Sequence, residues 1–120
     1  MLQADELLSR LCRVPGVAGV IMVTAEGFLV AAETGLGGRS AEETAAAVVA
    51  NLGKGVGGAL ERLGRGEIKH LVVSGAGGRL ALVRAGPGYL AALLDSEANL
   101  GLAQLELAGA AVEAARKMAR

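Results

Sequence analysis

The chain has 120 residues, of which 52% are hydrophobic and 20% charged, and its formal net charge at pH 7 is zero. This composition is typical of a folded domain, and the length predicts a single domain over residues 1–120. With no excess of positive charge and only Phe28 and Tyr89 as aromatic residues, the chain is not expected to bind nucleic acid.

A single cysteine, Cys12, excludes an intramolecular disulfide bond. No secretory signal precedes the first helical segment, so we expect a cytoplasmic protein. The most apolar stretch, residues 14–32, is interrupted by Pro15 and several glycines. A membrane-spanning helix would not carry these interruptions, and no membrane insertion is expected.

The N-terminal part predicts a helix followed by a β-hairpin. Residues 2–12 have helical periodicity, with an apolar side formed by Leu7, Leu8 and Leu11. Residues 16–25 are rich in β-branched residues and apolar on both faces, which is typical of a buried central strand. Residues 28–33 predict its hairpin partner, after a turn in which Gly27 is free to adopt positive φ.

The middle of the chain predicts a long helix from residue 41 to about Leu63. Ser40 and Glu43 fit the S-x-x-E capping box that often begins a helix. Glycines destabilise a helix interior. They therefore leave two alternatives open: a continuous helix packed closely against another helix, or a break near Gly57 and Gly58.

The C-terminal half predicts a three-strand meander and a last helix. Residues 67–75, 79–85 and 89–95 form the three expected strands, separated by glycine-containing turns. Residues 98–120 predict the helix. We expect its inner side to carry Leu102, Leu105, Val112 and Met118. The predicted order is α-β-β-α-β-β-β-α.

Residues Gly53 to Gly58 satisfy the pattern G-x-G-x-x-G of dinucleotide-binding loops. That fingerprint requires a strand before the first glycine and an acidic residue about 20 residues further on. Here a helical segment precedes Gly53, and the segment at that distance, "LVVSG", contains no acid. The residue after Lys54 is glycine rather than serine or threonine, so a P-loop is also excluded. Nucleotide binding is not predicted.

Two stripes appear when residues 41–63 are plotted at about 100° per residue. The larger side chains are expected to lie on the sheet, and they are Ala45, Val49, Leu52, Val56, Leu60 and Leu63. The neighbouring stripe contains only small residues, namely Ala46, Ala50, Gly53 and Gly57. Small residues in a row let another backbone approach closely, so we interpret this second stripe as a helix–helix contact.

Residues that might carry catalysis are few. His70 is the only histidine, and it lies on a predicted strand with Ser74, whereas Cys12 ends the first helix. No histidine–cysteine cluster is present to bind a metal. We expect His70 to face the core or a partner, and we predict no catalytic residue, no cofactor and no metal. Four arginines, Arg39, Arg65, Arg79 and Arg84, are expected to be exposed, and one acting as an arginine finger on a GTPase is the less favoured interpretation.

Four segments together resemble the Roadblock / dynein light chain family. These are "VPGVAGVIMVTAEGFLVA", "AEETAAAVVANLG", "GEIKHLVVSGAGGRLALVRAGPGYLAALLD" and "NLGLAQLELAGAAVEAARKMA". The shared features are a helix running into a V-x-G-V strand, a glycine turn, a middle helix rich in small residues, a meander and a last helix beginning on an N-L-G-L stretch. The resemblance covers essentially the whole chain.

The resemblance implies an α+β fold, an α/β sandwich. It has a five-stranded antiparallel sheet with the middle helix on one face and the terminal helices on the other. It also implies a homodimer, or a heterodimer with a related Roadblock domain, in which middle helices and the strands after them pair antiparallel. We therefore expect a dimer interface at Ala46, Ala50, Gly53, Gly57, Ile68, His70, Leu71, Val72 and Ser74.

Three functional hypotheses remain. The favoured one, implied by the resemblance, is a non-enzymatic dimeric adaptor, regulator or scaffold that acts with a Ras-like small GTPase. A small-ligand sensor is the alternative, although few polar residues converge in the sequence. The third, a nucleotide-using enzyme, is largely excluded by the helical context of the glycines.

Overall fold

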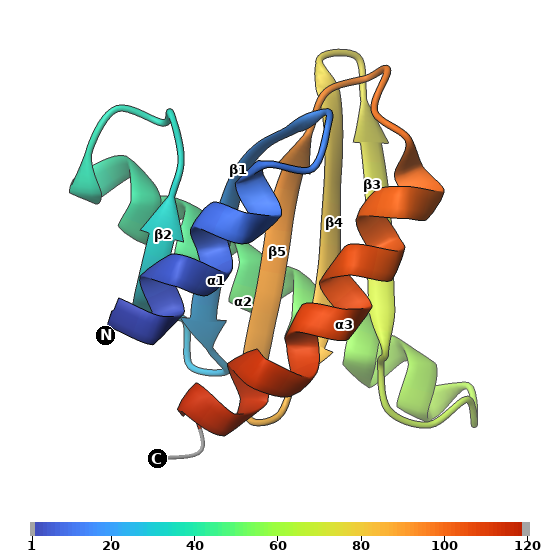
Figure 1. The fold of residues 1–120 in the computed structure, drawn as a ribbon. Coiled ribbons are helices and arrows are strands. Elements are labelled where there is room, and N and C mark those ends of the chain that lie inside the picture. Colours follow the sequence, from blue (N-terminus) through green and yellow to red (C-terminus); the bar gives the residue numbers. More distant parts are fainter. Residues whose placement is uncertain (1, 119–120) are drawn as a thin grey trace.

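The computed structural model describes residues 2–118, and side chains from residue 5 onward. Residues 119 and 120 of the expected last helix lie outside the described residues. The predicted element order is confirmed (Figure 1). The elements are α1 (Leu2–Cys12), β1 (Val17–Thr24), β2 (Leu29–Glu33), α2 (Arg39–Arg62), β3 (His70–Gly75), β4 (Gly78–Ala85), β5 (Gly88–Leu94) and α3 (Leu100–Met118).

The five strands form one antiparallel sheet in the order β2-β1-β5-β4-β3. β1 is an interior strand, as its sequence predicts, because consecutive residues from Val20 to Val23 are all buried and both faces of the strand are covered. The hairpin to β2 turns at Gly27, which has the expected positive φ of 102°. β5 and β4 lie between β1 and β3, so β3 forms one edge of the sheet.

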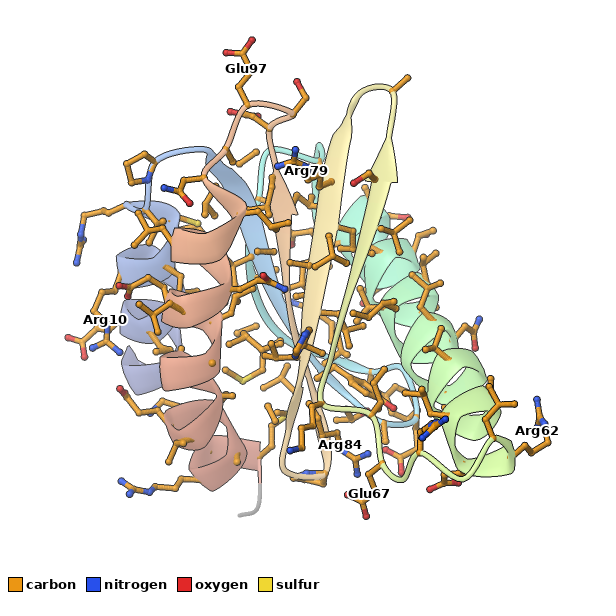
Figure 2. The ribbon with its side chains drawn as sticks, turned by 90° about the vertical axis from the view of Figure 1, so that its right-hand side faces the viewer. Arg10, Arg62, Glu67, Arg79, Arg84 and Glu97 are labelled. Carbon is orange, nitrogen blue, oxygen red and sulfur yellow. The ribbon has the colours of Figure 1, made fainter. Side chains whose placement is uncertain are left out.

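Helices cover both faces of this sheet, as the resemblance implied. α1 and α3 pack side by side on one face, and α2 packs on the other (Figures 1 and 2). Each face has its own core. Leu7, Leu8 and Leu11 of α1 are buried in the first, as predicted, and Ile21 and Leu82 are buried in the second. None of the helices within residues 2–118 has the length and apolar character needed to cross a bilayer.

The beginning of α2 differs from the prediction. The helix begins at Arg39 after Gly38, which has φ of 117° and serves as the N-cap without a side-chain hydrogen bond. Ser40 therefore lies inside the first turn, and the expected capping box is wrong. Glu43 instead forms an ion pair with Arg39, in which the Oε2 atom of Glu43 lies 3.3 Å from the Nε atom of Arg39.

α2 runs without interruption through all its glycines, so the alternative of a break near Gly57 and Gly58 is wrong. The larger residues expected on the sheet are confirmed in part: Val49 is buried, and Ala45, Val56 and Leu60 pack against the same core. Leu63 lies beyond the end of the helix and is exposed. The side that faces the sheet is wider than predicted, because Ala46, Ala50 and Gly53 are buried as well. The small-residue stripe lies on the sheet. At Gly53 the contact is so close that a Cβ atom would overlap the ring of Tyr89.

α3 is rotated relative to the prediction. Its buried residues are Ala103, Leu107, Ala110 and Ala114. Three of the four residues expected inside point outward, with exposed fractions of 37% for Leu102, 69% for Leu105 and 58% for Val112. Met118 does pack against the core. Small alanines bring α3 close to the sheet, and they leave its larger side chains on the outer surface.

Candidate functional site

The edge strand β3 has one unpaired side. Its register with β4 runs from His70 opposite Val83 to Gly75 opposite Gly78, and the N–H of Arg84 donates to the carbonyl of Lys69 at 2.9 Å. Hydrogen-bonded and non-hydrogen-bonded pairs alternate in an antiparallel ladder. The backbone groups of Leu71 and Val73 therefore point to β4. Those of the residues between and beside them point to the free edge, namely His70, Val72 and Ser74.

The side chains beside this edge are mostly apolar. Leu71 is half-buried against the core under α2, and Val73, two residues further along, is 43% exposed. Successive side chains of a strand alternate between faces, so Val73 lies on the same face as Leu71. α2 packs over β1, β2, β5 and β4. An unpaired edge with exposed apolar neighbours is a surface that pairs readily with another strand.

The residues predicted for a dimer interface separate into two groups. Ala46, Ala50 and Gly53 are buried against the sheet of their own chain, which leaves them no surface for a partner. Their expected role in a helix–helix contact is wrong for this reason. Gly57 lies over Ile68, which is itself 4% exposed.

The remaining predicted residues lie together on β3. His70 and Ser74 are exposed, and Leu71 and Val72 are half-buried. Val73 belongs to the predicted strand but is not among the named interface residues, although it alternates with Leu71 on the same face. The pairing of this strand with a second chain stays a prediction.

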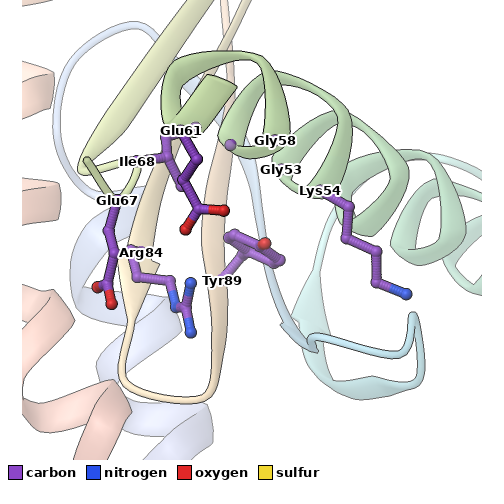
Figure 3. A pocket seen from close by; sticks show the side chains of 9 residues that line it. Gly53, Lys54, Gly58, Glu61, Glu67, Ile68, Arg84 and Tyr89 are labelled. Carbon is purple, nitrogen blue, oxygen red and sulfur yellow. The ribbon is translucent and has the colours of Figure 1, made fainter. Parts of the chain in front are cut away.

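A hollow of about 320 Å³ opens between the second half of α2 and the β4–β5 turn (Figure 3). The glycines of α2 form one wall, and Tyr89 and Arg84 lie opposite. The lining residues are Gly53, Lys54, Gly57, Gly58, Glu61, Glu67, Ile68, Arg84 and Tyr89. Sequence reasoning missed this hollow because Tyr89 meets Gly53 only after the chain has folded.

Arg84 is held in place at the rim of the hollow. Its Nε donates to the carbonyl of Gly86 at 2.6 Å, and its guanidinium lies 5.6 Å from the centroid of the Tyr89 ring. Lys54, Glu61 and Glu67 complete two positive and two negative side chains, all exposed. Small-molecule sites are mostly apolar and enclose their ligand. This open, charged hollow is better suited to polar contacts with another protein.

The candidate catalytic residues do not meet. Cys12 packs near β2, with its Sγ 3.6 Å from the carbonyl oxygen of Glu33, whereas His70 and Ser74 lie on β3 at the opposite edge of the sheet. Burial and, second, the charge of Glu33 raise the pKa of the Cys12 thiol, which disfavours the nucleophilic thiolate. Within residues 2–118, no group of three or more histidine, cysteine, aspartate or glutamate side chains is arranged to hold a metal.

The predicted arginines differ in their surroundings. Arg79 is half-buried rather than exposed, and its Nη1 donates to the carbonyl of Ala98 at 3.2 Å. Arg39 and Arg84 are exposed but bonded to their own chain, as described above. Arg65 is exposed in the loop after α2.

Comparison with known proteins supports one family. Residues 3–95 match the model of the Roadblock/LC7 domain. The Roadblock/LC7 domain from Streptomyces avermitilis is 26% identical, with a TM-score of 0.87 and coverage of 97% of this chain and 98% of that one. An MglB structure with a tetrameric arrangement is 25% identical, with a TM-score of 0.85 and coverage of 96% and 87%.

MglB from Myxococcus xanthus shares the fold at 20% identity, with a TM-score of 0.86 and coverage of 98% of this chain and 95% of that one. A sequence search among curated proteins gives no match. The family model covers most of the chain, and the observed element order agrees with it. The chain therefore belongs to the Roadblock/LC7 family.

Proposed function

We propose that the chain is a dimeric adaptor or regulator that acts with a Ras-like small GTPase in the cytoplasm and performs no catalysis of its own. Membership in the Roadblock/LC7 family supports this role, as do the similar structures of MglB and of MglC from Myxococcus xanthus. The observation that carries the proposal is the unpaired edge of β3 with its apolar neighbours. An adaptor acts by binding other proteins, and an unpaired strand edge readily pairs with a strand of another chain.

The dimer uses the free backbone groups of β3. A second copy pairs its own β3 antiparallel, with the two-fold axis at Val72, so that both strands exchange hydrogen bonds through this residue. In that register Leu71 opposes Val73 of the second copy, and the exposed part of Val73 becomes covered. A related Roadblock domain with the same edge would form the heterodimer in the same way.

The outer side of α2 completes the dimer. Because the small-residue stripe faces inward, contact between the two α2 helices uses the outward residues Val48, Asn51 and Gly55. Val48 is 50% exposed, and a Cβ atom at Gly55 would meet only open space. A partner helix can therefore approach the backbone closely at Gly55.

The GTPase role is tested by complex formation. The purified chain is mixed with each Ras-like GTPase of the source organism, loaded with GDP or with a non-hydrolysable GTP analogue, and analysed by size-exclusion chromatography with light scattering. We expect a complex with one of them that depends on the nucleotide state. Single-turnover hydrolysis of GTP then distinguishes an activator from a scaffold. If none of the GTPases binds in either state, the proposal is wrong.

A small-ligand sensor is the second candidate, and the hollow beside Tyr89 is the feature that favours it. Thermal denaturation with a library of charged metabolites tests it. A rise in Tm that is lost in the variant Arg84→Ala would support the sensor. No rise with any compound leaves the adaptor as the better account.

A further inference from the structure

The two helices on one face of the sheet have different outer surfaces. α1 and α3 lie side by side (Figure 1). The outer side of α1 carries Asp5, Glu6 and Arg10, and Arg13 follows directly after the helix. The outer side of α3 carries instead the exposed apolar residues Leu102, Leu105 and Val112. Exposure to solvent does not explain this difference, because the outer surfaces of both helices are exposed in the single chain.

The exposed residues of α3 form a continuous stripe. At about 100° per residue, Leu102, Leu105, Gly109 and Val112 lie within one narrow sector, opposite the buried Leu107. Scattered single leucines on a surface are ordinary, but an apolar stripe over about three helical turns, here from Leu102 to Val112, is typical of a protein contact.

Gly109 is the second observation. It lies inside the helix, where glycine is less favourable than alanine, and a Cβ atom there would meet no atom within 4 Å. The fold of this chain therefore gives no reason for a glycine at this position. A closely approaching neighbour on the outer side gives one.

The charges at the two ends of α3 indicate which helix could lie against the stripe and in which direction. Asp95 and Glu97 precede the helix, and Arg116 and Lys117 lie in its last turn. A second α3 lying antiparallel brings the acidic end of each helix to the basic end of the other. A parallel neighbour would place like charges together, so the charge pattern favours antiparallel pairing.

We propose that the outer stripe of α3 binds the same stripe of a second copy of this chain, antiparallel, with the two-fold axis near residue 107. In this register Leu105 of each chain packs over Gly109 of the other, and Leu102 packs against Val112. Glu97 approaches the exposed Arg116 of the second copy, which lies in the same sector as the stripe. Each contact is made twice, as two-fold symmetry requires.

This contact is separate from the β3 edge. α3 lies on the opposite face of the sheet from α2, so both surfaces are available at once (Figure 2). The inference does not depend on the proposed function. If both contacts form, the assembly has four or more chains, and if only the α3 contact forms, the chain is a simple dimer.

The test compares two charge insertions by sedimentation equilibrium. Leu105→Glu places a carboxylate in the centre of the stripe. Phe28→Glu is the matched control, because Phe28 is 70% exposed in the β1–β2 turn. We expect Leu105→Glu to weaken association through α3 by roughly tenfold or more and to reduce the assembled mass at least by half, whereas Phe28→Glu leaves it unchanged.

The final mass of Leu105→Glu separates this inference from the β3 pairing: a dimer shows that β3 pairs, and a monomer shows that it does not. The variant Arg116→Glu is expected to weaken association, and the additional change Glu97→Lys to restore it. If the wild-type chain is no heavier than Leu105→Glu at any concentration, or if the double reversal restores nothing, the antiparallel α3 contact is wrong.

Discussion

α2 and α3 are both long helices rich in alanine and glycine, and they cover opposite faces of the same sheet. Their glycines nevertheless have different surroundings. Gly53 of α2 faces the sheet, where the ring of Tyr89 occupies the space that a side chain would need. Gly109 of α3 faces away from the sheet, into open space. A glycine within a helix therefore does not by itself indicate a contact between chains.

This comparison also explains why small residues of both helices were wrongly expected to lie away from the core. The larger side chains of each helix were assigned to the core, which is the usual pattern of an amphipathic helix. In α3 the fully buried residues are three alanines and Leu107, and in α2 they include Gly53. Both helices lie so close to the sheet that small residues are buried there without a large side chain.

The largest expected effect separates the two sides of α3. Leu107 is 2% exposed and Leu105 is 69% exposed. We expect Leu107→Ala to lower the free energy of unfolding by about 2–5 kcal/mol, because it leaves a cavity in the core. Leu105→Ala in dilute solution changes it by about 0.5 kcal/mol or less. Urea denaturation measures both, and equal losses would mean that the rotation of α3 described here is wrong.

A smaller effect is expected at the inward glycine of α2. Helix propensity alone favours alanine over glycine by about 1 kcal/mol. At Gly53 the added methyl group overlaps Tyr89, and overpacking of this kind typically destabilises by about 1–3 kcal/mol. We therefore expect Gly53→Ala to lower the urea midpoint. Gly55→Ala on the outer side of the same helix is the control and raises it. A midpoint that rises for both variants would remove the packing role of Gly53.

The smallest effect is expected at the outward glycine of α3. Gly109→Ala adds a methyl group in open space and should raise the free energy of unfolding of the separate chain by roughly 0.5–1 kcal/mol. The same change fills the position over which Leu105 of a second copy is proposed to pack, so association should weaken. Calorimetry of the dilute chain and sedimentation of the concentrated one measure the two effects. Opposite signs support the comparison, and a destabilised chain contradicts it.

Much of the fold was predictable because short apolar runs and glycine turns in the sequence indicate its strands and turns. The apolar run of β1 predicted a central strand, and the glycine turns separated the strands of the meander correctly. The start of α2 was not predictable in the same way, because Gly38 is the N-cap and the helix begins two residues earlier than the Ser40 motif suggested. The resemblance supplied the arrangement of the helices on the two faces, and the structure confirmed it.

The candidate site was less predictable. That β3 lies at an edge depends on the order of the strands, which no local pattern states. The hollow at Tyr89 arises from residues of α2, β4, β5 and the loop before β3, which meet only in the folded chain. The outward stripe of α3 was visible in the sequence, but only its rotation on the sheet distinguishes an outer surface from a core.

The central claim is that the free edge of β3 pairs with a second chain, and one proline variant tests it most directly. Val72→Pro removes an N–H that points to the free edge and leaves the hydrogen bonds of Leu71 and Val73 to β4 in place. Val72→Ala is the matched control, since it reduces the side chain but keeps the N–H. Both are made in the Leu105→Glu background and measured by analytical ultracentrifugation. The account predicts a dimer for the background and for Val72→Ala, and a folded monomer for Val72→Pro; a background that is already monomeric, or a stable dimer of Val72→Pro, would contradict it.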